Sequence, residues 1–547
     1  MVAKTKSGWE ERSHKNIKAD IIVLGCSLPG IVTAHKLNKK FGDTINIVVL
    51  DLAGNQKVNG ASQRNVGFQE DEQADTETYS FDGTARQLID NVARHYLAMF
   101  AKDFKISLPE TIIIPRNVTA PFSKIFEYSN GTTVPCPNDY HDFDYLNFLE
   151  RFELNQYQTL LDENMKDLFQ TNKVDAASER LKLLYYDKTT MEQHICEALL
   201  FPNSRQIMRT MVRLVCGVPP NTVSVLFYLH QCYRTSSAKN HLGGCNTRFR
   251  EKLLGYCRKH LANKLQQSIA KITLSAKSIK EIRSYSNKQV ILTTMKGETN
   301  YICNLLAMAL KPDELEDIEV EANLLSEKEA AIAKAMKQGK AKKFMVQYEE
   351  SFWKEQGYSG DIFSMRGPIL WAMQRPKLST TGDSEHFPSL VGYLMIKNDK
   401  EEDSKEAVIR QLVKLFGQEA ANPLSYKEAN IADVFVPRCG DYVALRKLTN
   451  GACPQNLEWG ALDIFADGDV AAALEAGNTA YLHLMSCLRP QAQSYEEVVS
   501  GEWPTFLNET PYTKWFAKFN IVKTMHVIAC TAAIYVGIRV MQSMRRN

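Results

Sequence analysis

The sequence predicts an α/β protein with two sheet-containing domains, a helical insert and a C-terminal helix. Three observations predict it: a strand–turn–helix–strand pattern within residues 19–51, helical periodicity between 145 and 242, and a return to strand patterns from 272 to 396. Strands that alternate with helices are typical of this class. With 547 residues, 44% hydrophobic and 24% charged, the chain is long enough for two ordinary globular domains.

The first predicted unit is a strand, a helix and a second strand. Residues Ala19–Leu24 and Ile45–Leu50 are runs of apolar and β-branched side chains, the pattern of strands that are buried on both faces. Between them, Ile31–Lys40 has the apolar spacing of a helix. The segment therefore predicts a compact β-α-β unit.

The remaining elements alternate between helix and strand. Residues 145–175 and 189–242 form the predicted helical insert, and the charged, alanine-rich segment 327–343 is expected to be one helix. Further helices are expected at 85–105, 407–416 and 469–488, and further strands at 111–114, 272–292, 301–309, 344–348, 362–363 and 390–396.

The turn after the first strand carries the strongest local motif. It reads Gly25-Cys26-Ser27-Leu28-Pro29-Gly30, at the place where a dinucleotide-binding unit has G-x-G-x-x-G. Gly25 suits the tight turn and Gly30 suits close helix packing, whereas Ser27 replaces the glycine that lets the backbone approach phosphates. Asp51 ends the second strand, where a carboxylate can bind ribose hydroxyls. The motif predicts a pyrophosphate site at the helix N-terminus.

Composition argues against several other classes of protein. The net charge of +3 is spread over the whole chain, so nucleic-acid binding is not expected. Twelve cysteines are scattered without a C-x-x-C pair, which indicates reduced thiols facing the cytosol and no zinc ribbon. The eleven histidines show no metal-ligand spacing, and the sequence has no P-loop, G-x-S-x-G or H-E-x-x-H motif.

The two ends of the chain differ in character. Residues 1–18 are polar and are expected to be a disordered lead-in without a signal peptide. The C-terminal segment 521–538 is mostly apolar, but its uninterrupted part, Val527–Ile538, is only 12 residues, short of the about 20 that span a bilayer. An amphipathic or buried helix is one interpretation. We favour a C-terminal tail anchor, with Trp515 near the interface.

Four further segments resemble the flavin-containing amine oxidases, especially the monoamine oxidase branch. Residues 348–354 (YEESFWK) are similar to its Y-K-E-x-F-W-K segment, and 425–430 (SYKEAN) to its Y-E-E-K-N stretch. Residues 474–477 (LEAG), with Gly468 ahead of them, are similar to its closing flavin-contact helix, and 504–507 (PTFL) precede an apolar tail as its membrane anchor does. The resemblance covers roughly residues 18–540.

The resemblance implies a Rossmann-like FAD-binding domain and a second, mixed-sheet substrate domain. We expect the first to comprise 19–85, 243–310 and 440–490, and the second to comprise 86–242 with the helical insert and 311–439. Residues 491–547 would form a C-terminal arm with the anchor. The membrane implied is the mitochondrial outer membrane, with the protein facing the cytosol; a cytoplasmic protein is the alternative.

The resemblance also carries over individual residues. Lys343 matches the lysine that holds a water near the flavin N5 atom, although it can equally be a surface lysine of its charged run. Cys439 lies within one position of the cysteine that carries covalent flavin, although a structural free cysteine is the alternative. Gly25, Ser27, Gly30 and Asp51 would contact FAD, as would Gly60 in the segment Asn59-Gly60-Ala61, Cys439, and Gly468 before the closing helix.

Other positions depart from the family pattern. Gly440 or Asp441 and Asp469 stand where the family has the two tyrosines of its aromatic cage, and Trp459-Gly460-Ala461 replaces its G-T-E flavin segment. We therefore carry two hypotheses: FAD-dependent oxidation of a small amine, and a catalytically inactive relative with a binding or scaffolding role. In a third interpretation, the two aspartates hold a cationic substrate such as a polyamine. The oligomeric state stays open.

Overall fold

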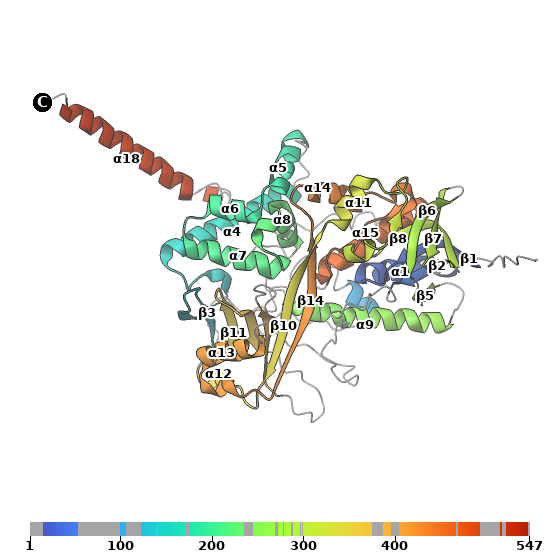
Figure 1. Cartoon of the computed structure of the whole chain (residues 1–547), viewed down its shortest axis with the longest axis horizontal. Coiled ribbons are helices and arrows are strands. Elements are labelled where there is room, and N and C mark those ends of the chain that lie inside the picture. The colour runs from blue at the N-terminus through green and yellow to red at the C-terminus, as the bar shows by residue number, and fades with distance from the viewer. Residues whose placement is uncertain are drawn as a thin grey trace, which may run out of the picture.

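The computed structural model confirms a mixed α/β fold built on two mixed sheets (Figure 1). It describes residues 15–52, 99–105, 122–138, 140–169, 176–234, 244–267, 272–276, 278–285, 288–295, 297, 299–374, 387–394, 404–466, 469–492, 515–516 and 521–544. Gly60, Gly468, the expected strand 111–114 and most of the expected helix 85–105 lie outside the described residues.

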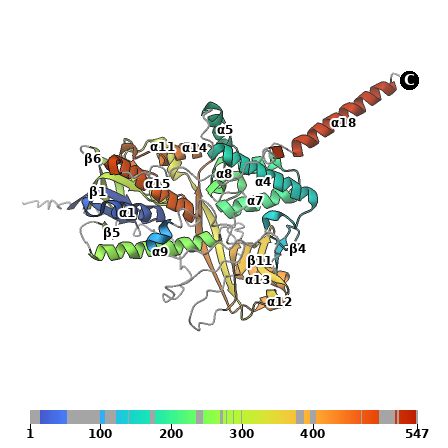
Figure 2. The ribbon, with the colours of Figure 1, turned by 180° about the vertical axis from the view of Figure 1, so that it is seen from behind.

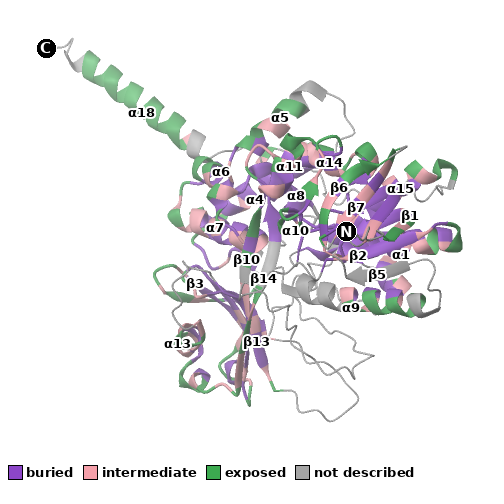
Figure 3. Cartoon of the chain, turned by 45° about the vertical axis from the view of Figure 1, so that its right-hand side comes forward, coloured by how far each residue is buried: buried purple, intermediate pink, exposed green. Residues whose placement is uncertain are grey.

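The first sheet has the strand order β5-β2-β1-β8-β7-β6-β9, with β15 beside β8. Its central strands β1 and β2 pair in parallel, and their Ile, Val and Leu side chains are buried because helices cover the sheet (Figure 3). β1 begins within the range expected to be a lead-in. The strands are β1 Lys15–Leu24, β2 Ile47–Asp51, β5 Ile272–Ala276, β6 Ile279–Tyr285, β7 Gln289–Thr294, β8 Thr299–Met308, β9 Glu319–Val320 and β15 Leu457–Glu458.

Three helices pack against this sheet and against one another (Figure 2). They are α1 Leu28–Phe41, α9 Gly244–Gln267 and α15 Val470–Leu488. α1 and α15 touch at a glycine, because a Cβ atom on Gly477 would lie 2.7 Å from the Pro29 carbonyl oxygen. The Thr33 hydroxyl fixes this contact, lying 2.8 Å from the Pro29 carbonyl oxygen and 3.0 Å from that of Gly477. A helix from late in the chain, α15, thus packs on the first helix.

The second sheet has the order β14-β10-β13-β12-β11-β3-β4. Its longest ladder joins β10 to β14 in antiparallel register, from Lys337↔Val436 to Gln347↔Ser425. The short helix α12 Phe352–Glu355 and the longer α13 Ser404–Phe416 accompany this sheet. Its strands are β3 Ser123–Glu127, β4 Thr133–Cys136, β10 Lys337–Gln347, β11 Tyr358–Ser364, β12 Ile369–Gln374, β13 Ser389–Leu394 and β14 Ser425–Val436.

The expected single helix over 327–343 is wrong in its second half. Helix α11, Glu327–Lys334, begins with a capping box at Ser326, and β10 starts at Lys337. Strand pairing with β14 overrides the helical preference of this segment, and Lys342 forms an ion pair with Glu428 across the ladder. Lys343 therefore lies on a strand and is only partly exposed.

The helical insert is present, and residues 176–188, which lie between its two predicted segments, are helical as well. It consists of α4 Phe148–Phe169, α5 Ala176–Lys188, α6 Met191–Ala198, α7 Pro202–Cys216 and α8 Val225–Arg234. Two short helices, α10 Pro312–Leu315 and α14 Tyr442–Thr449, complete the body. The last helix, α18 Ile521–Met544, projects away from the body and is exposed to solvent (Figures 1 and 3).

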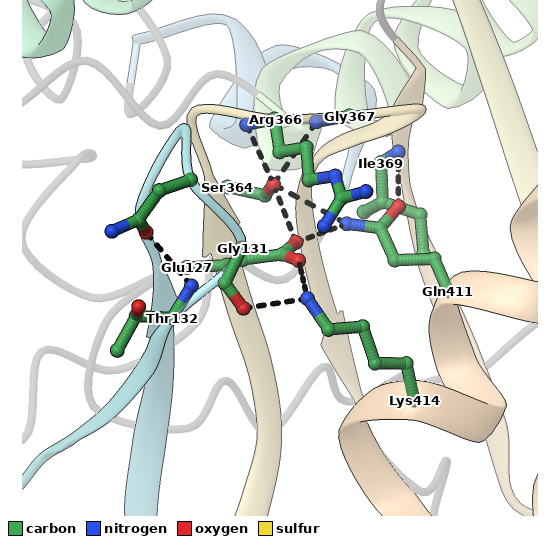
Figure 4. A network of polar contacts seen from close by, with 10 residues as sticks. Glu127, Gly131, Thr132, Ser364, Arg366, Gly367, Ile369, Gln411 and Lys414 are labelled. Carbon is green, nitrogen blue, oxygen red and sulfur yellow. Dashed lines mark hydrogen bonds and ion pairs between the residues drawn. The ribbon is translucent and has the colours of Figure 1, made fainter.

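A buried carboxylate joins three elements of the second sheet (Figure 4). Glu127, at the end of β3, is 1% exposed and accepts hydrogen bonds from Ser364 at 2.8 Å and Gln411 at 2.7 Å. Lys414 on α13 lies 2.9 Å from its other oxygen and also donates to the Gly131 carbonyl at 2.6 Å. The charge of this buried group is therefore compensated by three donors.

Replacing Glu127 by glutamine is expected to lower the free energy of unfolding by about 2 kcal/mol, because hydrogen bonds to a charged group are lost. The matched control is Asp167→Asn, which removes an exposed ion pair with Lys182 and should change stability by no more than about 1 kcal/mol. Chemical denaturation of both variants measures the difference. Equal effects would show that the buried network adds nothing.

Candidate functional site

The glycine turn between β1 and α1 is closed by the end of β8. Gly25 has φ +109°, and a Cβ atom built on it would lie 2.2 Å from the Ala309 carbonyl oxygen. A Cβ atom on Gly30 would lie 2.5 Å from the Ala309 Cβ atom. Both positions therefore require glycine, as a dinucleotide-binding turn does.

Ser27 is the N-cap of α1 and links the turn to β8. Its hydroxyl donates to the Ala309 carbonyl at 2.8 Å and lies 3.5 Å from the Gly30 N–H, which donates to it. The exposed Arg258 on α9 donates to the Cys26 carbonyl at 3.2 Å, so a guanidinium lies beside this turn. Asp51 ends β2 and is partly buried. The structure thus brings together Gly25, Ser27, Gly30 and Asp51.

Burial and two charged side chains act on the Cys26 thiol in the turn. Burial raises the pKa of its thiol to about 12, and the negative charge of Asp51 acts in the same direction. The positive charge of Arg258 partly opposes these effects. Cys26 is therefore a neutral thiol at physiological pH, placed between an acidic and a basic group, and it is not a nucleophile.

A cavity of about 290 Å³ lies among the helices, on the side of α15 that faces away from the glycine turn. Phe169 forms one wall, with its ring 4.9 Å from that of His230, 5.1 Å from that of Tyr233 and 5.7 Å from the Arg446 guanidinium carbon. The Tyr442 hydroxyl is hydrogen-bonded to His230 Nδ1. The residues lining the cavity are Leu168, Phe169, His230, Tyr233, Tyr442, Leu445, Arg446, Thr449, Asn450, Gly460, Leu462, Ile464, Phe465, Glu475, Ala476 and Thr479.

Helix α15 connects this cavity with the glycine turn. Gly477 packs against Pro29 and Val32 of α1, whereas Glu475 and Thr479 line the cavity. The segment before α15 also connects them, because the Asp463 N–H donates to the Leu310 carbonyl at 2.9 Å, next to the turn. The two sites are therefore separated by about the diameter of one helix, on the order of 10 Å.

Lys343 lies inside the β10–β14 ladder, whereas Cys439 lies beyond one end of it. Lys343 pairs with Tyr393 and Ala429, whereas Cys439 follows the end of β14, beyond the pair Lys337↔Val436. The separation between Lys343 and Lys337 is about 20 Å along an extended strand. The positive charge of Lys337 acts on the Cys439 thiol and partly opposes the rise of its pKa. The structure does not bring these two predicted site residues together.

The surroundings of Cys439 keep its thiol protonated. Its Sγ atom lies 4.0 Å from the Thr222 carbonyl oxygen, and burial raises its pKa, helped by the charges of Asp187 and Asp441. Asp187 has a structural role here: its carboxylate accepts hydrogen bonds from the Tyr442 N–H at 3.2 Å and the Val443 N–H at 3.1 Å, which caps α14.

The two positions at which the family has its aromatic cage have separate roles in this chain. Asp469 is the N-cap of α15 and accepts a hydrogen bond from the Ala472 N–H at 3.0 Å. Asp441 precedes α14 without a side-chain cap. The next residue, Tyr442, supplies an aromatic ring to the cavity.

Sequence reasoning missed the cavity residues Phe169, His230, Arg446 and Glu475. They come from four separate helices, so no spacing in the sequence connects them. The one available signal was Tyr442, an aromatic residue next to the first of the two positions that had lost a tyrosine. Gly60 and Gly468 lie outside the described residues, so their predicted contacts with FAD stay predictions.

The two mixed sheets and the glycine turn are the features expected of the flavin-containing amine oxidase class, and comparison with known families identifies the chain as a member. Residues 116–443, more than half of the chain, match the family described as flavin containing amine oxidoreductase. The chain therefore belongs to this family.

Its curated relatives are distant. A probable flavin-containing monoamine oxidase A of Dictyostelium discoideum is 24% identical over 291 residues, which is 48% of this chain and 60% of the relative. The flavin-containing amine oxidase A of Equus caballus is 24% identical over 46% of its length, and that of Sus scrofa is 23% identical over 77% of this chain and 74% of its own. The chain spans about half the length of the first two relatives.

Solved structures confirm the fold. Putrescine oxidase, in a structure bound to putrescine, is 13% identical with a TM-score of 0.59, over 86% of this chain and 100% of that one. Cyclohexylamine oxidase from Brevibacterium oxydans IH-35A is 16% identical with a TM-score of 0.60, over 86% and 99%. At these identities the likeness shows the fold alone.

Proposed function

We propose that this chain binds FAD at the glycine turn and oxidises an amine that occupies the helical cavity. The observation that carries the proposal is the shared wall formed by α15, which packs on the turn through Gly477 and lines the cavity through Glu475. Family membership gives the cofactor class. A cofactor whose dinucleotide part lies at the turn and a substrate in the cavity would then lie on opposite sides of the same helix.

The residues of the turn fit the dinucleotide part of FAD. The N-terminus of α1 offers the positive end of a helix dipole to a pyrophosphate, and the exposed Arg258 offers a guanidinium beside it. Asp51 ends β2, where a carboxylate can accept hydrogen bonds from a ribose. When bound, FAD would accept a hydride equivalent from the amine and pass the electrons to oxygen.

The cavity fits an amine that carries a positive charge. Phe169, Tyr233 and Tyr442 offer aromatic rings, which attract cations, and Glu475 offers a carboxylate. Arg446 keeps the cavity from being uniformly acidic, so we propose a substrate with one cationic end and one polar or apolar end. We give the flavin-side role to Lys343 and treat Cys439 as a structural thiol, so FAD is held without a covalent bond.

A second candidate function is a catalytically inactive protein that keeps this fold for binding or scaffolding. It is favoured by Trp459, which is fully buried in the segment that replaces the family's G-T-E residues. It is also favoured by Asp469, because its carboxylate accepts a hydrogen bond from the Ala472 N–H in the first turn of α15. A negative group there competes with any acceptor atom of a flavin for the helix N–H groups.

Visible absorption of the purified full-length protein separates these functions. We expect flavin bands that move to the supernatant when the protein is precipitated with acid, because the linkage is not covalent. Flavin that stays with the precipitate would contradict the role given to Cys439. No flavin, even after addition of FAD, would overturn the enzyme proposal and support the inactive one.

Peroxide release with a panel of amines then tests the cavity. We expect Glu475→Gln to raise the KM for a diamine about tenfold or more while an aromatic monoamine changes less, since a hydrogen-bonded charge is lost. The control is Glu281→Gln, whose carboxylate pairs with Arg283 on β6 and does not line the cavity; it should leave both substrates unchanged. Equal effects of the two variants would remove the amine site from this cavity.

We also propose attachment to the mitochondrial outer membrane by the C-terminal tail, with the body facing the cytosol. Residues Thr524–Met541 of α18 are long and apolar enough to cross a bilayer, with mean hydropathy 1.5 and no burial. At the base of the tail, Trp515 is 62% exposed and the Phe516 ring lies 5.4 Å from that of Phe152. Phe148, one turn before Phe152, is also exposed and gives the body an apolar edge near the tail.

A further inference from the structure

Two cysteines meet behind the cavity at the far end of α15. Cys453 lies in the loop after α14, and Cys487 lies in the last turn of α15, one turn after His483 and close enough to raise the pKa of the Cys453 thiol. Cys453 is 8% exposed, whereas Cys487 is open to solvent. The fold therefore pairs a sheltered thiol with an accessible one.

A buried carboxylate contacts the sheltered thiol of Cys453. Glu458 is fully buried, and its Oε2 atom lies 3.3 Å from Cys453 Sγ and 3.1 Å from the Cys453 backbone nitrogen. Its Oε1 atom accepts from the Gly460 N–H at 2.7 Å and contacts His483 Nδ1 at 2.9 Å. Cys453, Glu458 and His483 thus form one chain along which a proton can move.

The backbone holds Cys453 in an unusual conformation. Its φ is +45°, and Gln455 and Asn456 in the same loop have φ values of +53° and +65°. Three non-glycine residues with positive φ in one loop are uncommon, and such conformations cluster at functional sites. Because such conformations cost local stability, they indicate that this loop has a functional role.

The two thiols differ in their surroundings and therefore have different roles in an oxidation. Burial raises the pKa of the Cys453 thiol, and the charge of Glu458 acts in the same direction. Cys453 is thus protonated until a base removes its proton. Cys487 is the thiol that an external oxidant can reach, so it is the first to react.

We propose that Cys453 and Cys487 form a peroxide-reactive dithiol, a redox modification site separate from the amine cavity. The Cys487 thiolate attacks hydrogen peroxide: an S–O bond forms, the O–O bond breaks, and hydroxide leaves and becomes water with the thiol's proton. The peroxide is reduced by two electrons, and Cys487 becomes a sulfenic acid.

The second step closes the disulfide. Glu458 takes the proton of Cys453, whose sulfur then attacks Cys487; the S–S bond forms, the S–O bond breaks, and the leaving hydroxide receives that proton as water. Two thiols and one peroxide thus give one disulfide and two waters. The disulfide would tie the loop after α14 to α15, two elements that both border the cavity.

The test uses detergent-solubilised full-length protein, added hydrogen peroxide, alkylation and peptide mass analysis. It does not rest on the proposed oxidase function, because the peroxide comes from outside. We expect a Cys453–Cys487 disulfide that a thiol reductant reverses. Cys453→Ser should leave a sulfenic acid on Cys487, trapped by dimedone, and Cys487→Ser should leave Cys453 reduced.

The matched control is Cys196→Ser, which removes an exposed thiol that contacts Glu192 and Arg209. It should leave the disulfide unchanged. Glu458→Gln should slow the closure of the disulfide about tenfold or more, since a general base is lost. His483→Gln, at the other end of the chain, should slow it in the same direction. Peroxide that oxidises Cys196 as readily, or leaves the Cys453–Cys487 pair unlinked, would overturn the proposal.

Discussion

Replacing Gly25 by valine is expected to lower the free energy of unfolding by about 4 kcal/mol or more. The new Cβ atom would lie 2.2 Å from the Ala309 carbonyl oxygen, an overlap that only a backbone shift can relieve. A β-branched residue is also strained at φ +109°. Because whole domains are stable by only about 5–15 kcal/mol, we expect mostly insoluble protein and a much lower thermal midpoint for what remains.

Gly42→Val is the matched control. Gly42 also has a positive φ, +50°, but a Cβ atom added there would meet no atom of another part of the chain within 4 Å. It therefore carries the backbone strain without the clash, and we expect a loss of about 1–3 kcal/mol. If the two variants were equally destabilised, the contact between the turn and β8 would not be what requires glycine at position 25.

The parts of the fold that sequence could predict are those set by local patterns. The buried runs of β1 and β2 and the helix between them are contiguous, so their hydrophobic periods identify them directly. The segment 327–343 shows the limit of that reasoning. Its alanines and lysines favour a helix, but a twelve-residue partner strand, β14, lies nearly a hundred residues later in the chain and draws its second half into a sheet.

The candidate site divides in the same way. Gly25, Ser27 and Gly30 could be predicted as a group because one turn contains them, and Asp51 because it ends the next strand. Glu475 and His230 could not, since only the packing of α15 near α8 places them around one cavity. Family resemblance suggested that Lys343 and Cys439 share a flavin, but it carried no information about the strand register that separates them.

Deleting residues 519–547 is expected to move the protein from the membrane pellet to the supernatant. The removed part contains α18, whose 18-residue span Thr524–Met541 has mean hydropathy 1.5 and has no buried residue in the structure. A helix of 24 residues is about 36 Å long, enough for a hydrocarbon core of about 30 Å. Sedimentation after alkaline extraction measures the result, and a truncated protein that still resists extraction would contradict the anchor.

A single charge tests whether the helix crosses the bilayer or lies on its surface. Ile534 is near the middle of the span and is exposed, so Ile534→Arg places a guanidinium in the hydrocarbon core of a spanning helix, at a cost of about 3 kcal/mol. That cost lowers membrane partitioning more than a hundredfold, whereas the control Ile534→Leu leaves it unchanged. A helix lying in the interface would tolerate the arginine, because its long side chain can reach the headgroups. Retention of the arginine variant in the pellet would therefore replace the spanning anchor with a surface helix, and protease added to intact mitochondria would still reach the body in either case.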